Sequence, residues 1–233
     1  NATGNTLTAA RGTTFTTTVD GTSYNYIVKD ATTITPVDGV YTFSNLPVYE
    51  GTLVTNKYTV DTSNADQRFL IKNSLVDTNT LLVTVQNSSS DTTTNTYTLS
   101  TDLADISSTS KVYYLEGAED QQYEVKFGDG VLGEALSTGN IVTLSYIVTN
   151  AEESNGASSF SLSGTLGGFS NVTITTATNS ANGAQPETPD SIRFNAPRQY
   201  ASQNRTVTAK DYESKVKSIY TNAKSVSVWG GED

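Results

Sequence analysis

Apolar and polar residues alternate along much of the first 150 residues of the chain, which is the pattern of half-buried β-strands. At residues 123–127 the side chains of Tyr123, Val125 and Phe127 fall on one face of a predicted strand. Residues 142–148 repeat the alternation, with an apolar side chain at every even position. These two runs predict strands that bury one face and expose the other face to solvent.

Asp-Gly pairs mark chain reversals near the N-terminus. Asp20-Gly21 lies between two runs rich in Thr, Tyr and Val, and Asp38-Gly39 lies between two more. Both central residues of a type I′ turn need positive φ angles, which Asp-Gly adopts readily. The chain is therefore predicted to begin as an antiparallel meander.

We interpret residues 123–150 as a hairpin around which the other strands are organised. Gly128-Asp129-Gly130 follows the first strand, and its glycines supply positive φ angles that other residues resist. The Asp129 side chain can accept hydrogen bonds from its own backbone. We expect Gly128, Asp129 and Gly130 to form a structural turn that fixes the register of the hairpin.

The region after residue 150 is rich in Ser, Gly, Thr and Asn, with two isolated apolar pairs. Phe160 with Leu162, and Val172 with Ile174, each predict a short strand. Residues 178–185 have the composition of a linker.

The apolar spacing becomes helical after this linker. Pro189-Asp190 is a helix-start signal, although Pro197 is expected to kink or shorten that helix. Thr208 has the chemistry of an N-cap, with Asp211 three residues later as in a capping box. An apolar stripe from Tyr212 to Tyr220 then predicts a second helix, and residues 225–229 predict a final strand.

Composition agrees with a mainly β protein. A chain of 233 residues exceeds the common size of one domain, and its 35% hydrophobic content favours sheets with one wet face. The predicted fold class is α+β and mainly β. It has antiparallel or barrel-like β units in more than one domain and a short two-helix segment near the C-terminus.

The net charge of −10 is distributed unevenly along the chain. Residues 1–190 carry 7 basic and 20 acidic groups, whereas residues 191–233 carry 7 and 4, a balance of +3. Nucleic-acid binding depends on Lys and Arg that neutralise phosphates, so an acidic body argues against a nucleic-acid partner. The basic end suits either an acidic protein partner or solvated helix faces. No apolar run approaches the roughly 20 residues of a membrane helix, so membrane insertion is not expected.

The chain lacks histidine and cysteine, which removes the usual general base and the usual zinc, haem and thiol ligands. Carboxylate chemistry remains, as in a glycosidase that needs two facing carboxyl groups. The candidates are Glu116, Glu119, Asp120, Asp129 and Glu134, and each also fits a solvated or turn position. No EF-hand or phosphate-binding pattern is present. We expect no catalytic residue, no cofactor and no bound metal, and hence no enzyme.

Arg and Tyr residues concentrate in the helical segment, where they are candidates for contacts with another subunit. The interface candidates are Arg198, Tyr200, Arg205, Tyr212 and Trp229. Tyr212 fits equally well in the core of a two-helix unit. For Trp229, at the end of the predicted final strand, packing in a core or sheet is the favoured interpretation. The arginines also suit local capping and ion pairing.

Six fragments of the sequence, in order, resemble the baseplate J-like family, in particular the wedge subunits of T4-like contractile-tailed bacteriophages. They are NLPVYEGT (45–52), LVDTNTLLV (75–83), SKVYYLEG (110–117), FGDGVLGEALSTGN (127–140), PETPDSIRFNAPRQYASQNRTVTAKDYE (186–213) and VWGGED (228–233).

The resemblance implies a domain organisation. Residues 1–60 and 150–182 would form one discontinuous β domain, into which residues 61–149 are inserted. Residues 183–222 would be the helical J-like segment, and residues 223–233 the start of a truncated C-terminal domain.

The resemblance also implies a function. The chain would be a structural subunit of the baseplate wedge of a contractile phage tail, in the ring that surrounds the central hub and links the wedges. Its partners would be other wedge proteins and further copies of itself, in a dimer or ring. It would be assembled in the host bacterial cytoplasm and reside in the virion tail baseplate. The alternative is a carbohydrate-binding β module of a tail or cell-surface protein.

Overall fold

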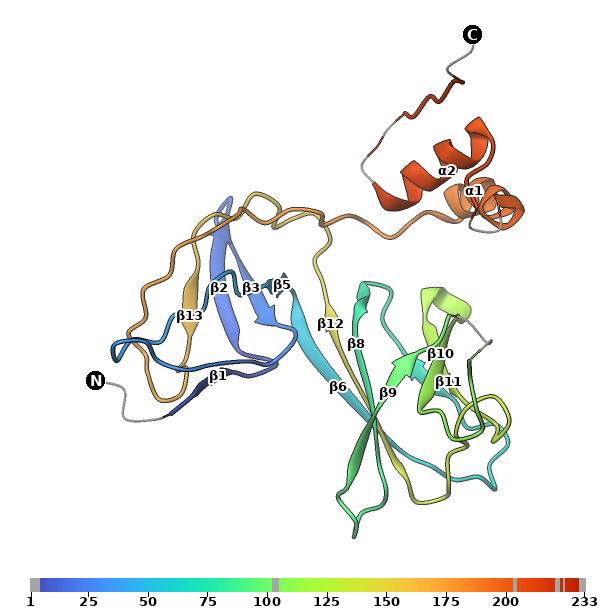
Figure 1. Ribbon diagram of the computed structural model, residues 1–233, viewed down its shortest axis with the longest axis horizontal. Helices are drawn as coiled ribbons and strands as arrows, with labels where there is room; N and C mark the ends of the chain where they lie inside the picture. The colour runs from blue at the N-terminus through green and yellow to red at the C-terminus, as the bar shows by residue number, and fades with distance from the viewer. Residues whose placement is uncertain (1–4, 102–104, 203–204, 221–222, 224, 231–233) are drawn as a thin grey trace. The chain divides into compact units, whose positions relative to one another are not determined.

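The computed structural model describes residues 5–101, 105–202, 205–220, 223 and 225–230 (Figure 1). The chain divides into two compact units, residues 1–183 and residues 184–233. Among the described residues, all strands lie in the first unit and two helices lie in the second. The protein is α+β and mainly β, with several sheets and a nearly closed barrel-like sheet, as predicted.

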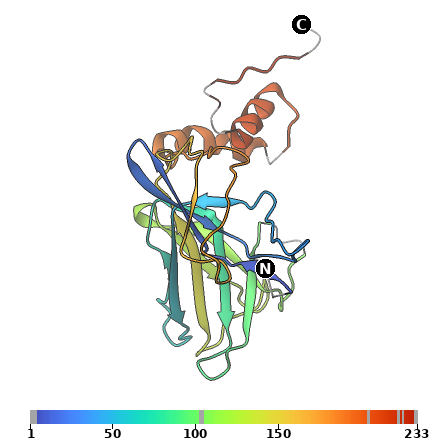
Figure 2. The ribbon, with the colours of Figure 1, turned by 90° about the vertical axis from the view of Figure 1, so that its left-hand side faces the viewer.

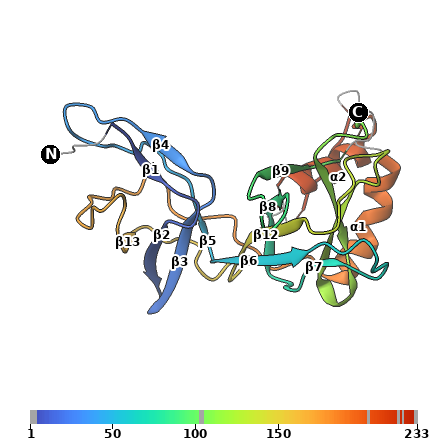
Figure 3. The same cartoon turned by 90° about the horizontal axis from the view of Figure 1, so that it is seen from below.

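Two small sheets form one part of the first unit (Figures 1 and 3). The two-stranded sheet pairs β1 (Leu7–Ala9) with β4 (Thr32–Ile34). The four-stranded sheet has the order β13-β2-β3-β5, with β13 at Ser161–Ser163, β2 at Thr14–Val19, β3 at Thr22–Val28 and β5 at Val48–Glu50. Their shared core is made by Ala9, Phe15, Tyr24, Tyr26, Val28, Ala157 and Leu166.

The turn between β2 and β3 confirms the first predicted reversal. Val19 pairs with Thr22, so Asp20 and Gly21 are the only residues between the strands. Their φ angles are 48° and 83°, both positive as a type I′ turn requires. Asp38-Gly39 likewise has positive φ angles, between the bridged residues Val37 and Val40.

The seven-stranded sheet forms the other part of the first unit (Figures 1 and 2). Its order is β6-β12-β8-β9-β10-β11-β7. The strands are β6 (Thr52–Thr59), β7 (Phe69–Ile71), β8 (Val76–Gln86), β9 (Thr94–Leu99), β10 (Val112–Gly117), β11 (Tyr123–Phe127) and β12 (Ile141–Val148). A short 3-10 helix, η1 (Glu119–Gln121), joins β10 to β11.

This sheet curls until its two edge strands come within reach of each other. The Tyr58 hydroxyl on β6 donates a 2.7 Å hydrogen bond to the Leu70 carbonyl on β7, and the Tyr58 ring packs edge-on against Phe69. The interior is fully apolar at its centre, where Ile71, Val83, Val142 and Leu144 have no exposed surface. Near-closure lets one face of the sheet bury its apolar side chains inside, while threonines such as Thr55, Thr96 and Thr98 remain exposed.

The predicted hairpin at residues 123–150 is wrong. Strand β11 pairs with β10 and β7, whereas β12 pairs with β6 and β8, so the two strands are far apart in the sheet order. Residues 128–140 form a loop with its own internal contacts and do not reverse the chain between paired strands. Alternation correctly identified both strands, but it carries no information about which strands are partners.

Arg11 and a bulge in β8 connect the two β parts of the first unit. Residues 78–81 of β8 lie opposite the single residue Tyr146 of β12, which interrupts the ladder. The buried Thr80 hydroxyl accepts a 2.9 Å hydrogen bond from the Ile147 amide in place of a ladder partner. Arg11, from the loop between β1 and β2, donates to the carbonyls of Thr80 (2.6 Å), Ser145 (3.0 Å) and Lys29 (2.7 Å).

The second unit contains α1 (Pro189–Ser202) and α2 (Ala209–Ile219). The capping box is confirmed: the Asp211 amide donates to the Thr208 hydroxyl (3.3 Å), and the Thr208 amide donates to the Asp211 carboxylate (2.8 Å). Helix α1 continues through Pro197, so that proline does not shorten it. The predicted final strand is wrong, because residues 225–229 have no strand pairing with the described part of the chain. No helix among the described residues is long and apolar enough to cross a membrane.

Candidate assembly surface

The helical unit exposes an unusual number of large apolar side chains. None of the residues of α2 is buried. The exposed apolar residues of the unit are Ile192, Phe194, Tyr200, Val207, Tyr212, Val216, Ile219, Tyr220 and Trp229. Scattered exposed apolar residues are normal, but a concentration of this kind within one small unit is typical of a protein interaction surface. The described residues of this unit therefore lack a closed core of their own.

Most of the predicted interface residues are exposed on this unit. Tyr200 is 84% exposed and Tyr212 is 48% exposed, so Tyr212 is not a core residue of the two-helix unit. Trp229 is 78% exposed, which contradicts the favoured interpretation that it packs in a core or sheet. The side chain of Arg198 lies outside the described part of the structure.

Arg205 lies at the start of the second helix region, beside the capping box. Hydrogen bonds from Thr208 hold the pKa of Asp211 below its usual range, and the nearby positive charge of Arg205 adds to this effect. A carboxylate at a helix N-terminus also complements the helix dipole. Arg205 thus has a local electrostatic role, which was one of the two roles open for it from the sequence.

The turn at Gly128, Asp129 and Gly130 is stabilised by hydrogen bonds to the Asp129 side chain. The Asp129 carboxylate accepts 2.9 Å hydrogen bonds from the amides of Leu132 and Val131, and these bonds hold its pKa below the usual range. Gly130 has a φ of 87°, but Gly128 is not among the residues with positive φ. The expectation that Gly128 provides a positive φ is therefore wrong.

Gly128 is needed because another part of the backbone passes very close to it. A Cβ atom at this position would be 2.2 Å from the carbonyl carbon of Gly133. Gly133 in turn is held by its amide, which donates to the Ser107 carbonyl (3.1 Å), and Glu134 is held in the same way by Ser110 (2.9 Å). The turn therefore closes a loop against the segment that leads into β10, and leaves Val131 70% exposed.

We expect Gly128→Ala to destabilise the protein by about 2–4 kcal/mol, because two backbone segments must move apart to admit the methyl group. Gly130→Val is expected to cost about 1–3 kcal/mol from its positive φ alone, since a Cβ at Gly130 meets nothing closer than 3.8 Å. Urea unfolding of both variants measures the difference.

Gly117→Ala is the matched control for Gly128, because Gly117 also lacks a positive φ but has open space around it. Gly139→Ala is the matched control for Gly130, because Gly139 has a φ of 93° and open space around it. It isolates the cost of the backbone angle. A Gly128→Ala variant that is no less stable than Gly117→Ala would show that the close approach to Gly133 is not a constraint.

Of the five carboxylates considered for catalysis, Glu116, Asp129 and Glu134 have local partners, and Glu119 and Asp120 are exposed in η1. Glu116 forms a 2.6 Å ion pair with Lys126 on the outside of the sheet. Burial, together with the charge and hydrogen bond of Glu134, raises the pKa of Tyr97 to about 12. Among the described residues no group of three or more acidic side chains is arranged to hold a metal ion.

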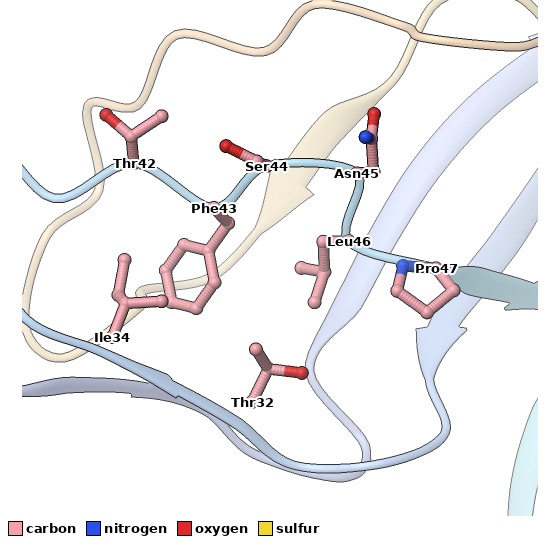
Figure 4. Close-up of a pocket in the computed structure, with 8 residues that line it drawn as sticks. All are labelled: Thr32, Ile34, Thr42, Phe43, Ser44, Asn45, Leu46 and Pro47. Carbon is pink, nitrogen blue, oxygen red and sulfur yellow. The ribbon is translucent and has the colours of Figure 1, made fainter.

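A hollow of about 310 Å³ lies between β4 and the segment that precedes β5 (Figure 4). It is lined by Thr32, Ile34, Thr42, Phe43, Ser44, Asn45, Leu46 and Pro47. Phe43 and Leu46 point toward Ile34 and Thr32, and both pack against the core of the small sheets. Because Ser44 and Asn45 point to the other side, the hollow has few polar groups converging on it, unlike a typical ligand site.

Among the described residues, folding alone does not explain the exposed apolar residues of the helical unit or the exposed tip of the Gly128–Gly133 loop. Neither brings together groups that would activate a substrate. Both are suited to contacts with other macromolecules. Comparison of the chain with protein-family models and with curated protein sequences finds no match.

Proposed function

We propose that the chain is a structural subunit of the baseplate wedge of a contractile phage tail. In this role it belongs to the ring around the central hub and links the wedges through contacts with other wedge proteins and with further copies of itself. It is assembled in the host cytoplasm, resides in the virion and performs no catalysis. The resemblance of the six sequence fragments to baseplate J-like proteins is the starting point of this proposal.

The observation that carries the proposal is the exposure of apolar side chains on α1 and α2. A helix with an apolar stripe normally buries that stripe, yet Tyr212 and Val216 are 48% and 40% exposed, and Ile219 is 74% exposed. An obligate assembly partner would cover such a stripe, with aromatic anchors at the centre and charges at the rim. The +3 balance of residues 191–233 suits an acidic partner surface.

We expect Tyr200→Asp and Ile219→Asp each to reduce incorporation into wedges by about ten-fold or more, because a charge placed in an apolar contact remains desolvated and unpaired. The measurement is co-expression with the other wedge proteins, followed by sedimentation and electron microscopy of the assembled particles. Since both side chains are exposed, the melting temperature of the isolated variants should stay at the wild-type value.

Val37→Asp is the matched control, because Val37 is 72% exposed but belongs to the first unit. It introduces the same charge at an equally open position. Wild-type yields of complete wedges from folded Tyr200→Asp and Ile219→Asp variants would refute the helical unit as the assembly surface, as would an equal loss with Val37→Asp.

A further inference from the structure

Residues 171–177 form an extended segment that behaves like a strand but is not paired with one. Its side chains alternate, with Val172, Ile174 and Thr176 half-buried and the residues between them exposed. Ile174 packs against the core of the small sheets. The sequence predicts a short strand here, but residues 170–178 form no hydrogen bond to any described part of the chain. The segment thus has the extended conformation of a strand but none of the backbone hydrogen bonds that pair a strand with its neighbours.

The segment is fixed at both of its ends. Before it, Leu166 and Phe169 exchange backbone hydrogen bonds of 2.8 and 3.0 Å across a Gly-Gly turn. After it, the Ser180 amide donates to the Ala157 carbonyl (2.9 Å), and the Gly156 amide donates to the Ser180 carbonyl (2.8 Å). It follows β13 in the chain and runs along the outer rim of the small sheets (Figures 1 and 3). Fixed ends and a packed inner face reduce the entropy lost when another strand pairs with it.

Nothing in the local sequence protects this segment from pairing. Natural proteins shield open strand edges with charged residues, with proline or with a covering element. Residues 154–186 contain no Asp, Glu, Lys or Arg, and residues 171–177 contain no proline. The β-branched residues Val172, Thr173, Ile174, Thr175 and Thr176 also favour a sheet. An edge of this kind is suited to strand addition by another uncharged strand.

The sequence of the segment is compatible with its own copy. In an antiparallel pair centred on Ile174, Val172 faces Thr176 and Thr173 faces Thr175, so half-buried positions meet half-buried positions and exposed threonines meet threonines. This arrangement has two-fold symmetry, as most dimer interfaces do. A charged partner strand would not be favoured here, because the segment has no residue of opposite charge with which to form an ion pair.

We propose that residues 171–177 are a self-association edge, at which two copies of the chain join by antiparallel strand pairing centred on Ile174. The small sheets of the two copies would then be linked through backbone hydrogen bonds. This contact is separate from the helical assembly surface, and it is tested with the purified chain alone, without other wedge proteins.

The test is a register-specific charge exchange. Thr173→Lys combined with Thr175→Lys places lysines opposite each other twice, and is expected to weaken dimerisation about ten-fold in sedimentation velocity. Thr173→Lys combined with Thr175→Glu instead places a lysine of one copy opposite a glutamate of the other, and is expected to restore wild-type dimerisation. Hydrogen exchange should show amides of residues 171–177 that become protected as the protein concentration rises.

Thr96→Lys combined with Thr98→Lys is the matched control. These two threonines are also exposed and two residues apart, but they lie on β9, which is paired on both sides. This variant should dimerise like the wild type, and all variants should melt like it. The proposal is overturned if the wild-type chain stays monomeric up to millimolar concentration. It is also overturned if the double-lysine variant at 173 and 175 dimerises like the wild type, or if the lysine–glutamate variant dimerises no more tightly than the double-lysine variant.

Discussion

Arg11→Met is expected to lower the free energy of unfolding by about 2–4 kcal/mol, because hydrogen bonds from a charged donor are lost and their acceptors have no replacement. The guanidinium donates to the carbonyls of Lys29, Thr80 and Ser145, and burial lowers the pKa of Arg11. Methionine fills a similar length of the site but has no donor. Urea unfolding measures the loss directly.

Lys126→Met is the control for this prediction. Lys126 makes a 2.6 Å ion pair with Glu116, the two side chains are 48% and 53% exposed, and exposed ion pairs contribute only about 0–1 kcal/mol. Arg11→Lys should be intermediate, because one ammonium cannot reach three carbonyls in a fixed planar arrangement. Equal losses for Arg11→Met and Lys126→Met would show that Arg11 acts only as a surface charge.

Gly51→Ala is expected to destabilise the protein by about 3–5 kcal/mol, since it combines backbone strain with overpacking. Gly51 joins β5 to β6 with a φ of 129°, a conformation that residues with a Cβ rarely adopt. A Cβ atom would be 2.3 Å from the Val148 carbonyl oxygen and 2.6 Å from the Ile147 side chain on β12. Thermal and urea unfolding of the variant are the measurements.

Gly21→Ala separates the two contributions, because Gly21 also has a positive φ, of 83°, but a Cβ there meets nothing within 4 Å. Its cost should be about 1 kcal/mol, from the backbone angle. If Gly51→Ala were no worse than Gly21→Ala, the approach of β12 would not constrain the junction.

Features encoded within a few consecutive residues were predictable from the sequence. The Asp20-Gly21 turn and the Thr208–Asp211 capping box are both present, because in each case the residues that interact are neighbours in the chain. The strand predicted at Phe160–Leu162 exists as β13. The division of the chain into strands and helices follows from the same short-range periodicity.

Features that depend on distant contacts were not predictable. Residues 123–150 read as a hairpin, but the partners of β11 and β12 are chosen by the closure of the whole sheet. Gly128 and Gly130 look alike in the sequence, yet Gly128 is constrained by contact with Gly133 and Gly130 by its own φ. Arg11 carries no local signal at all, since its three acceptors are 18 to 134 residues away.

The candidate assembly surface was partly predictable. Tyr200 and Tyr212 were chosen as contact candidates because Arg and Tyr residues gather in this segment, and both are exposed, although the sequence left a core position equally open for Tyr212. Trp229 was misjudged, since the segment before it forms no strand with the described residues. The unpaired segment at residues 171–177 has a strand-like sequence, and only the structure reveals that its ladder is missing.

The pairing of β6 with β12 has a consequence for the order in which the chain folds. Strand β2 cannot complete its pairing until β13 is in place, and their paired residues Thr16 and Ser161 are 145 positions apart. Once the seven-stranded sheet forms, Thr52 and Val148 are adjacent, so the chain between β2 and β13 is effectively shortened to about a third. This reduces the entropy cost of closing the loop by about 1 kcal/mol. Formation of the seven-stranded sheet thus brings β13 close to β2, which was synthesised earlier, so that the four-stranded sheet can be completed.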